Sequence, residues 1–223
     1  MDITQQQEIK VKENEMRFNL PTINNLIDDL KANKNEIKGF DDVVNRYSSY
    51  SRCLLIGDID PELGEGIETF IRFFNKLDDE NKVAIEDREP IKLYIDSCGG
   101  DLDATFTIID AIKLSKTPVC TINIGNAYSG GFFIFIAGDK RYAYPHSTFL
   151  YHEGSTATGG TAGQFENYSA FYKKQLAKLR EHTLERTKIS EEKYNEIKKE
   201  DFWMMSDEAL ELGVCDKILE EFV

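Results

Sequence analysis

The chain has 223 residues, of which 41% are hydrophobic and 30% charged, so it is long enough to bury a core and lacks the composition of a disordered chain. Its formal net charge of −13 reflects 40 acidic residues against 27 basic ones. Because nucleic acids and anionic lipids are bound mainly through clustered lysine and arginine, this balance argues against a nucleic-acid partner or a membrane surface. No stretch approaches the roughly 18 apolar residues of a membrane span, and the polar N-terminus has no signal-like apolar segment. We therefore expect a cytoplasmic protein.

The first stretch, residues 1 to about 46, is polar and highly charged, and its pattern indicates no chemistry. One segment within it, Leu20 to Leu30, spaces its apolar residues along a single helical face. From about residue 50 the pattern changes, because strand-like and helix-like segments alternate at short intervals. This alternation is typical of a mostly parallel α/β core.

The strands and helices of this core can be placed from their periodicity and end signals. Asp60 followed by Pro61 indicates the start of a helix, because an acidic N-cap and a first-turn proline suit the free N–H groups there. Its apolar stripe runs to Leu77, and the acidic segment from Asp78 to Pro90 is predicted to be a long solvated loop. A second helix is predicted over Leu102–Leu114. The predicted strands are Cys53–Gly57, which we expect to be buried, Lys92–Asp96, Val119–Ile124 and Thr148–Tyr151.

The last third of the chain favours helices. Aromatic and aliphatic residues recur at helical spacing from about Gln164 to Thr187, which predicts a long amphipathic helix that protrudes or packs on a partner. A loop of small residues, GSTATGGTAG, precedes this helix. Ser190 and Ser206 are each expected to cap a further helix, and the second of these helices stops at Gly213.

The cysteines and histidines show no spacing typical of a metal site. No CxxC pair occurs among the four cysteines, and no histidine stands at ligand spacing from one of them. We therefore expect no metal ion, no other cofactor, and reduced thiols that are mostly buried. The cysteines are Cys53, Cys98, Cys120 and Cys215.

Ser129 lies at the junction of two apolar runs, in the stretch TINIGNAYSGGFFIFIAG. The run after Gly131 is apolar on all sides, which indicates a buried helix or strand. If it is a helix, Ser129 stands at its N-terminus, where free N–H groups and the helix dipole would stabilise the charge of a tetrahedral oxyanion. The alternative is that the glycines only allow a tight turn between packed elements.

His152 follows the strand predicted over Thr148–Tyr151 and is the candidate general base. Imidazole titrates near neutral pH and can take a proton from a serine hydroxyl. The other histidines have plainer interpretations, since His146 lies in a turn and His182 lies among the charged residues of a helix. A strand-end histidine that only completes its hydrogen bonds is the alternative. Asp201, in KKEDFW, is one of 40 acidic residues, and composition alone cannot separate it from a solvated helix face.

Separate stretches of the chain resemble the proteolytic subunit of the Clp protease family, in the same order along the sequence. The resemblance covers about residues 47–223 and leaves residues 1–46 as an N-terminal extension of unknown role. It aligns Ser129 with the family's catalytic serine in an ASMGA-like motif, His152 with its base in an HQP-like turn, and Asp201 with its acid. The stretches are GDIDPELGEGIETFIRFFNKL, LYIDSCGGDLDATFTIIDAI, TINIGNAYSGGFFIFIAGDKRYAYPHSTFLYHEG and DFWMMSDEALELGVCDKI.

The resemblance also implies a fold and an oxyanion hole. The fold is an α/β spiral of βα units, of the Clp protease and crotonase type, with a protruding helical handle over about residues 155–201. The hole is formed by the backbone N–H groups of Gly100 and Gly130. Gly130 replaces the family's usual Met and Cys98 its Pro, so we expect a looser hole and a less restrained backbone beside it. Cys98 itself is a poor rival nucleophile, because no basic residue follows it to lower its pKa.

A serine endopeptidase is the activity that the resemblance implies. It would cleave unfolded proteins or peptides inside a closed chamber of two stacked heptameric rings, with the aromatic stripe of the handle as an interface. ATP would be used only by a partner, a hexameric AAA+ unfoldase, and residues 1–46 do not resemble the axial loops that engage it. Two alternatives remain: a crotonase-type acyl-CoA enzyme, which shares the fold but needs no such triad, and a catalytically silent ring subunit.

Overall fold

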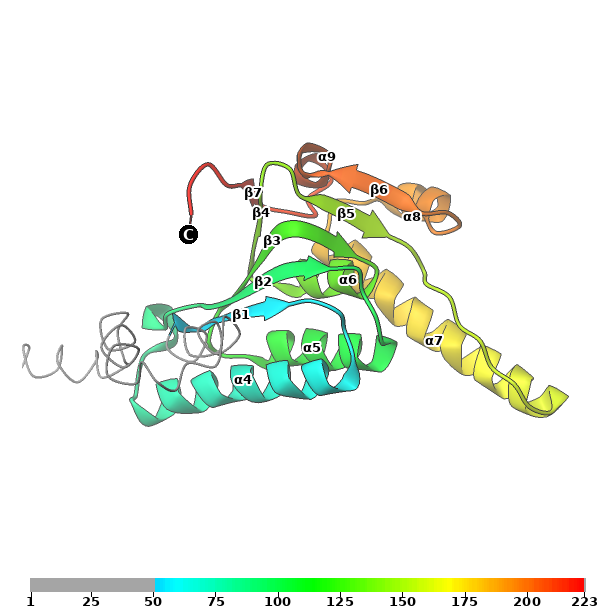
Figure 1. Ribbon diagram of the computed structural model, residues 1–223, viewed down its shortest axis with the longest axis horizontal. Coiled ribbons are helices and arrows are strands. Elements are labelled where there is room, and N and C mark those ends of the chain that lie inside the picture. The colour runs from blue at the N-terminus through cyan, green and yellow to red at the C-terminus, as the bar shows by residue number, and fades with distance from the viewer. Residues whose placement is uncertain (1–50, 223) are drawn as a thin grey trace, which may run out of the picture.

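The structure is a computed structural model that describes residues 51–222, in which helices pack on a seven-stranded sheet (Figure 1). The helix expected over Leu20–Leu30 lies outside the described residues. The strands are β1 (Cys53–Ile56), β2 (Ile91–Ser97), β3 (Val119–Tyr128), β4 (Lys140–Ala143), β5 (Thr148–Tyr151), β6 (Phe202–Met205) and β7 (Lys217–Ile218). The helices are α4 (Pro61–Glu80), α5 (Leu102–Leu114), α6 (Gly130–Ala137), α7 (Ala162–Arg186), α8 (Glu191–Ile197) and α9 (Ser206–Glu211), with a 3-10 turn η1 (Ile85–Asp87).

The sheet is mostly parallel, as the alternating pattern predicted. β1, β2, β3, β4 and β7 lie side by side in that order, and each neighbouring pair is parallel. β3 is longer than predicted because it changes neighbours along its length. Cys120 to Asn123 pair with β4, and Asn126 to Tyr128 pair with β5. β5 in turn pairs antiparallel with β6, so β5 and β6 form a branch of the sheet beside the end of β3.

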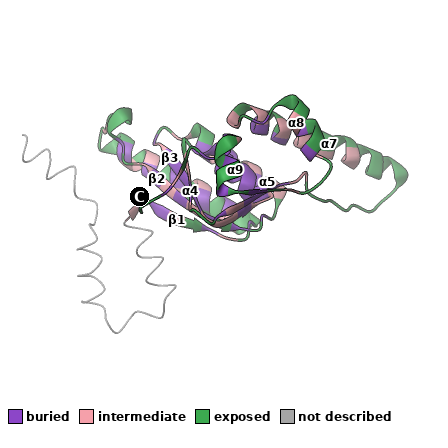
Figure 2. Ribbon diagram, turned by 90° about the horizontal axis from the view of Figure 1, so that it is seen from above, coloured by how far each residue is buried: buried purple, intermediate pink, exposed green. Residues whose placement is uncertain are grey.

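The core lies on the face of the sheet that α4, α5 and α6 cover (Figures 1 and 2). On β2 the core side is formed by Ile91, Leu93 and Ile95, all fully buried, whereas Asp96, the next residue, is exposed. Every residue of α6 is buried. Burying one such large aliphatic or aromatic side chain stabilises the fold by about 1.5–3 kcal/mol, so α6 is held firmly in place.

Helix ends follow the predicted signals closely. The Asp60 carboxylate accepts a hydrogen bond of 2.8 Å from the backbone N–H of Leu63, which confirms it as the N-cap of α4. The start of α7 is fixed by a capping box, in which Thr161 and Gln164 exchange hydrogen bonds between side chain and backbone. No helix among residues 51–222 is long and apolar enough to span a membrane.

The predicted loop from Asp78 to Pro90 is wrong in its first and last parts. α4 continues to Glu80 and turns the Asp78 side chain inward, where it meets the equally buried Arg52. The Arg52 guanidinium donates two hydrogen bonds to that carboxylate, of 2.6 and 2.9 Å, and Thr117 donates a third of 2.7 Å. Arg88 is also buried and pairs with Asp79. Both ends of the segment thus belong to buried polar contacts, whereas its middle, residues 81–87, is mostly exposed, as predicted.

Two smaller expectations are also wrong. β1, expected to be buried, lies at the edge of the sheet formed by the described residues, and Leu55 is 51% exposed although Cys53 and Ile56 are buried. Ser206 is the first residue of α9 and not its N-cap, which is Met205. The Ser206 hydroxyl instead donates to the carbonyl oxygen of Pro145, 2.7 Å away in another part of the chain. Sequence spacing identified the helix but not this non-local bond.

The Arg52–Asp78 pair predicts a large loss of stability in the variant Asp78→Ala. Removing one partner of a buried ion pair leaves an uncompensated charge, so we expect the free energy of unfolding to fall by about 3–5 kcal/mol in a urea titration. Glu80→Ala is the matched control, because Glu80 lies on the same helix in an exposed pair with Lys76. That change should cost less than about 1 kcal/mol, and equal losses in both variants would contradict the assignment.

Candidate active site

The turn at Ser129 joins the end of β3 to α6 and has a strained backbone. Its φ of 53° and ψ of −119° lie where residues other than glycine are rarely found. The Ser129 N–H donates to the carbonyl oxygen of Leu150 at 3.0 Å, and its own carbonyl accepts the N–H of Phe132 at 3.0 Å. Its side chain makes no capping hydrogen bond with α6. Strain of this kind costs about 1–3 kcal/mol and clusters at functional sites, here with a free hydroxyl at a helix N-terminus.

The glycines beside Ser129 allow two chain segments to approach each other closely. Gly99 has a φ of 100°, and a Cβ there would lie 2.7 Å from the Cβ of Ser129. Gly100 has a φ of 152°, and a Cβ there would lie 2.0 Å from the carbonyl oxygen of Ile59. Neither position can carry a side chain without moving backbone. The segment after β2 is therefore pressed against the Ser129 turn.

The backbone N–H groups of Gly100 and Gly130 are available to a ligand. In the bridge between Ile59 and Gly100, the hydrogen bonds are made by the Gly99 carbonyl and the Asp101 N–H, so the Gly100 N–H points to the other side. Gly130 is the first residue of α6, whose first-turn N–H groups have no partner within the helix. Within residues 51–222 no hydrogen bond from either group is found. Two such donors could hold an oxyanion.

His152 and Asp201 are brought together by the pairing of β5 with β6. The antiparallel register sets Leu150 opposite Trp203 and Tyr151 opposite Phe202, so the next positions on the two chains are His152 and Asp201. The Nδ1 atom of His152 lies 3.7 Å from Oδ1 of Asp201. This separation suits an ion pair when the imidazole is protonated, and is longer than a hydrogen bond.

A cavity of about 410 Å³ contains four of the five residues that the sequence singled out, namely Gly100, Ser129, Gly130 and His152. Asp201 does not line the cavity. Within residues 51–222 no hydrogen bond joins the Ser129 hydroxyl to His152. The cavity has an aromatic wall and acidic residues but no lysine or arginine. It thus brings a hydroxyl, an imidazole and two free N–H groups to one space, which are the parts that acyl transfer needs.

A hydrogen-bonded network behind His152 was not predicted from the sequence. The Tyr172 hydroxyl on α7 donates to the carbonyl oxygen of Glu153 at 3.0 Å. The buried Tyr151 hydroxyl donates at 2.7 Å to that of Tyr194, which contacts the Glu153 carboxylate at 3.4 Å. Burial raises the pKa of Tyr151 well above its usual range, so this hydroxyl stays protonated. The network fixes the chain just after His152 to α7 and α8.

His182 lies in the long helix α7 among charged residues, as expected, but its own side chain is buried against α6. Its Nε2 atom lies 3.0 Å from the carbonyl oxygen of Phe133. Burial lowers the pKa of His182 to about 4, so the ring is neutral at physiological pH and its Nε2 carries the proton that this carbonyl accepts. His182 is thus a packing residue that ties α7 to the helix beginning after Ser129.

The thiols are mostly buried, as expected, and Cys98 is the exposed one among the four. The side-chain amide of Asn126 donates to the Cys98 sulfur at 3.7 Å. Cys98 does not line the cavity described above. Among the described residues there is no group of three histidine, cysteine, aspartate or glutamate side chains that could hold a metal ion.

Comparison with known proteins identifies the family. The model of the Clp protease family matches residues 40–222. A relative from Treponema denticola, named ATP-dependent Clp protease proteolytic subunit 2, is 30% identical over 187 residues that cover 83% of this chain and 90% of the relative. A protein of the same name from Treponema pallidum is 32% identical over 172 residues, covering 76% of this chain and 82% of its own length. The chain belongs to the Clp protease family, as the resemblance implied, and its mostly parallel α/β fold agrees with that family.

The strain at Ser129 predicts a stability difference between two variants of that residue. At this positive φ, alanine keeps the steric conflict of a Cβ whereas glycine removes it. We expect Ser129→Gly to unfold with a free energy about 1 kcal/mol higher than Ser129→Ala. Urea titration of both variants measures this difference. A glycine variant that is no more stable than the alanine variant would contradict the strained geometry.

Proposed function

We propose that the chain is a serine endopeptidase that uses Ser129 as nucleophile, His152 as general base and Asp201 as the acid that orients the base. The observation that carries the proposal is the strand pairing of β3, β5 and β6. Ser129 follows β3, His152 follows β5 and Asp201 precedes β6, so all three residues lie at the same end of these neighbouring strands. Gly100 and Gly130 are proposed to donate the N–H groups of the oxyanion hole. Membership of the Clp protease family supports all five roles together.

The proposed reaction is acyl transfer to serine followed by hydrolysis. His152 takes the hydroxyl proton of Ser129 as its oxygen attacks a peptide carbonyl, and the N–H groups of Gly100 and Gly130 bind the oxyanion. The imidazolium then gives its proton to the leaving amine, which breaks the peptide bond and leaves an acyl-enzyme. Water, deprotonated by His152, hydrolyses that ester and restores the serine. No cofactor takes part in these steps.

The distance between His152 and Asp201 suggests that the site tightens when it is occupied. Asp201 stabilises the imidazolium best through a hydrogen bond, which requires the 3.7 Å separation to close to about 3 Å. Catalytic hydrogen bonds are often long in the absence of substrate. The network around Glu153 connects His152 to α7, so a movement of α7 is the natural cause of this tightening.

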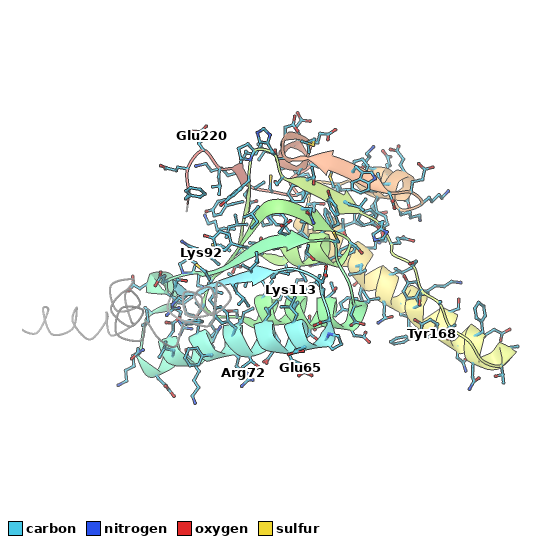
Figure 3. The ribbon with its side chains drawn as sticks, in the orientation of Figure 1. Glu65, Arg72, Lys92, Lys113, Tyr168 and Glu220 are labelled. Carbon is cyan, nitrogen blue, oxygen red and sulfur yellow. The ribbon has the colours of Figure 1, made fainter. Side chains whose placement is uncertain are left out.

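The assembly that we propose is a closed chamber of two stacked heptameric rings, with α7 as the handle between them. α7 projects away from the sheet, and the segment after His152 runs outward beside it to the tip where α7 begins (Figure 1). Tyr168 lies on the projecting part (Figure 3), where its hydroxyl bonds that of Thr156. Phe165 is 57% exposed and Phe171 is 53% exposed. Large exposed aromatic side chains on one projecting helix favour burial against another subunit.

The setting of the activity is proposed on the same basis. Unfolded proteins or peptides are the proposed substrates on the basis of family membership, and the aromatic residues that line the cavity at Ser129 suit apolar side chains of such a substrate. A cytoplasmic location and a hexameric AAA+ unfoldase that uses ATP follow from the family alone. The division into an extension (1–46), a peptidase domain (47–223) and a handle (about 155–201) remains a prediction from the sequence.

A fluorophosphonate probe tests the proposed nucleophile directly. The probe forms a covalent adduct only with an activated serine, so we expect labelling of the native chain and none of Ser129→Ala. His152→Ala and Asp201→Ala should label more slowly. Removing the serine or the base should lower peptide turnover by about 10⁶-fold, by analogy with other triads.

Matched controls keep this test specific. Ser169→Ala and His146→Ala change the same residue types outside the cavity, so they should label like the native chain. No labelling of the assembled native chain would sink the peptidase proposal and favour a silent ring subunit. Labelling that persists in Ser129→Ala would show that another residue reacts.

Assembly through α7 predicts the effect of a charge on its exposed aromatic face. We expect the native chain to form rings of uniform mass, and Phe165→Glu to fall apart into smaller species, because a buried charge in an apolar interface is costly. Mass photometry measures both. Lys173→Glu is the control, since Lys173 is already charged and exposed on the same helix. Monomers of the native chain at micromolar concentration would contradict the assignment.

A further inference from the structure

Thr105 is a buried residue of α5 that lines the cavity at Ser129 and has no role in the mechanism above. Its hydroxyl donates to the carbonyl oxygen of Asp101 at 2.7 Å. The same carbonyl accepts the backbone N–H of Thr105 at 3.0 Å. The Thr105 side chain is therefore held in one orientation, and its Oγ1 atom is a fixed part of the cavity wall.

The Oγ1 atom of Thr105 occupies the space that a side chain at position 130 would need. A Cβ built on Gly130 would lie 2.6 Å from this oxygen and 3.0 Å from Cδ1 of Ile59. Carbon atoms do not approach an oxygen to 2.6 Å without something moving. The φ of Gly130 is not positive, so its backbone would accept any residue. Space alone, set mainly by Thr105, makes glycine necessary here.

Gly130 is one of the two proposed oxyanion donors, and residues of other segments pack closely around it. A Cβ on Gly99 would lie 3.0 Å from the Gly130 nitrogen. Thr105 and Ile59 lie next to the position that a Cβ on Gly130 would take. The position of a Cβ on Gly130 is also 3.6 Å from the Gly100 nitrogen, so Thr105 packs close to the point where both donors meet.

The looser oxyanion hole expected from glycine at position 130 stays a prediction, but Oγ1 of Thr105 lies 2.6 Å from where a Cβ at that position would be. Gly130 and Thr105 therefore form one steric unit, in which the Thr105 side chain occupies the space beside Gly130. A peptide packed in this way keeps its N–H direction without a side chain of its own.

We propose that Thr105 is a positioning residue for the oxyanion hole, whose hydroxyl oxygen packs on Gly130 and holds the Gly130 N–H toward the reacting carbonyl. This inference rests on the proposed peptidase function. It assigns the effect to the Oγ1 atom, so serine at position 105 should preserve it and alanine should not.

The test compares Thr105→Ala, Thr105→Ser, Gly130→Ala and the double variant Thr105→Ala/Gly130→Ala. A fluorogenic peptide gives kcat and KM, and a fluorophosphonate probe gives the rate of labelling. Removing a whole oxyanion donor lowers kcat by about 10²–10³-fold, so misplacing one should lower it by about 10-fold. We expect this loss in kcat and in labelling for Thr105→Ala and for Gly130→Ala, with KM changed less than kcat.

The conservative and double variants separate positioning from general damage to the fold. Thr105→Ser should keep kcat close to the native value, because it keeps the Oγ1 atom and its bond to Asp101. The double variant should be faster than either single variant, because the alanine Cβ at position 130 fills the space that Thr105→Ala opens. Thr107→Ala is the control, since Thr107 makes the equivalent bond to Asp103, at 3.0 Å, on the exposed side of the same helix.

The outcomes distinguish this inference from the proposed function. Native labelling together with an unchanged kcat in Thr105→Ala overturns the role of Thr105 alone. A double variant no faster than the faster single variant does the same, because the two side chains would then not compete for one space. If Thr105→Ser loses as much as Thr105→Ala, the Oγ1 atom is not the positioning group. Absence of labelling in the native chain overturns both ideas together.

Discussion

Strand β5 is hydrogen-bonded on both of its edges, and the geometry of the cavity depends on that double pairing. Its parallel pairing with β3 sets the end of β5 beside the Ser129 turn. Its antiparallel pairing with β6 sets His152 next to Asp201. The buried pair of Phe149 and Met204 holds the second register. A slip of one residue would turn every side chain of β5 to the opposite face, so the core and the site are specified by the same contacts.

The strained turn at Ser129 persists because the structure around it cannot relax. All of α6, from Gly130 to Ala137, is buried, and the burial of its large side chains contributes far more than the roughly 1–3 kcal/mol of strain at one residue. Glycines at positions 99 and 100 let the neighbouring segment close over the turn. The Ser129 turn is thus held by the apolar packing of α6 and by the close approach of the backbone at Gly99 and Gly100.

Local features of the fold could be predicted from the sequence, and non-local ones could not. The N-cap at Asp60 and the bounds of α5 and β5 depend on residues that are neighbours in the sequence, so periodicity and capping rules predicted them. The Arg52–Asp78 pair joins distant segments that no local pattern connects, and His182 is buried by the backbone of another helix. Among 40 acidic residues only the family pattern pointed to Asp201, and the β5–β6 register sets it next to His152. Thr105 gives no signal in the sequence, because its role depends on a glycine from another element.

The buried Arg52 stands at the point where the described chain begins, at the amino end of β1. Its guanidinium is held by Asp78, by the carbonyl oxygen of Glu89 and over the ring of Phe74. In a mostly parallel sheet the amino ends of the strands lie on one side and the carboxyl ends on the opposite side. The buried Arg52 pair thus lies at the amino ends of the strands, and the cavity that contains Ser129 lies at their carboxyl ends.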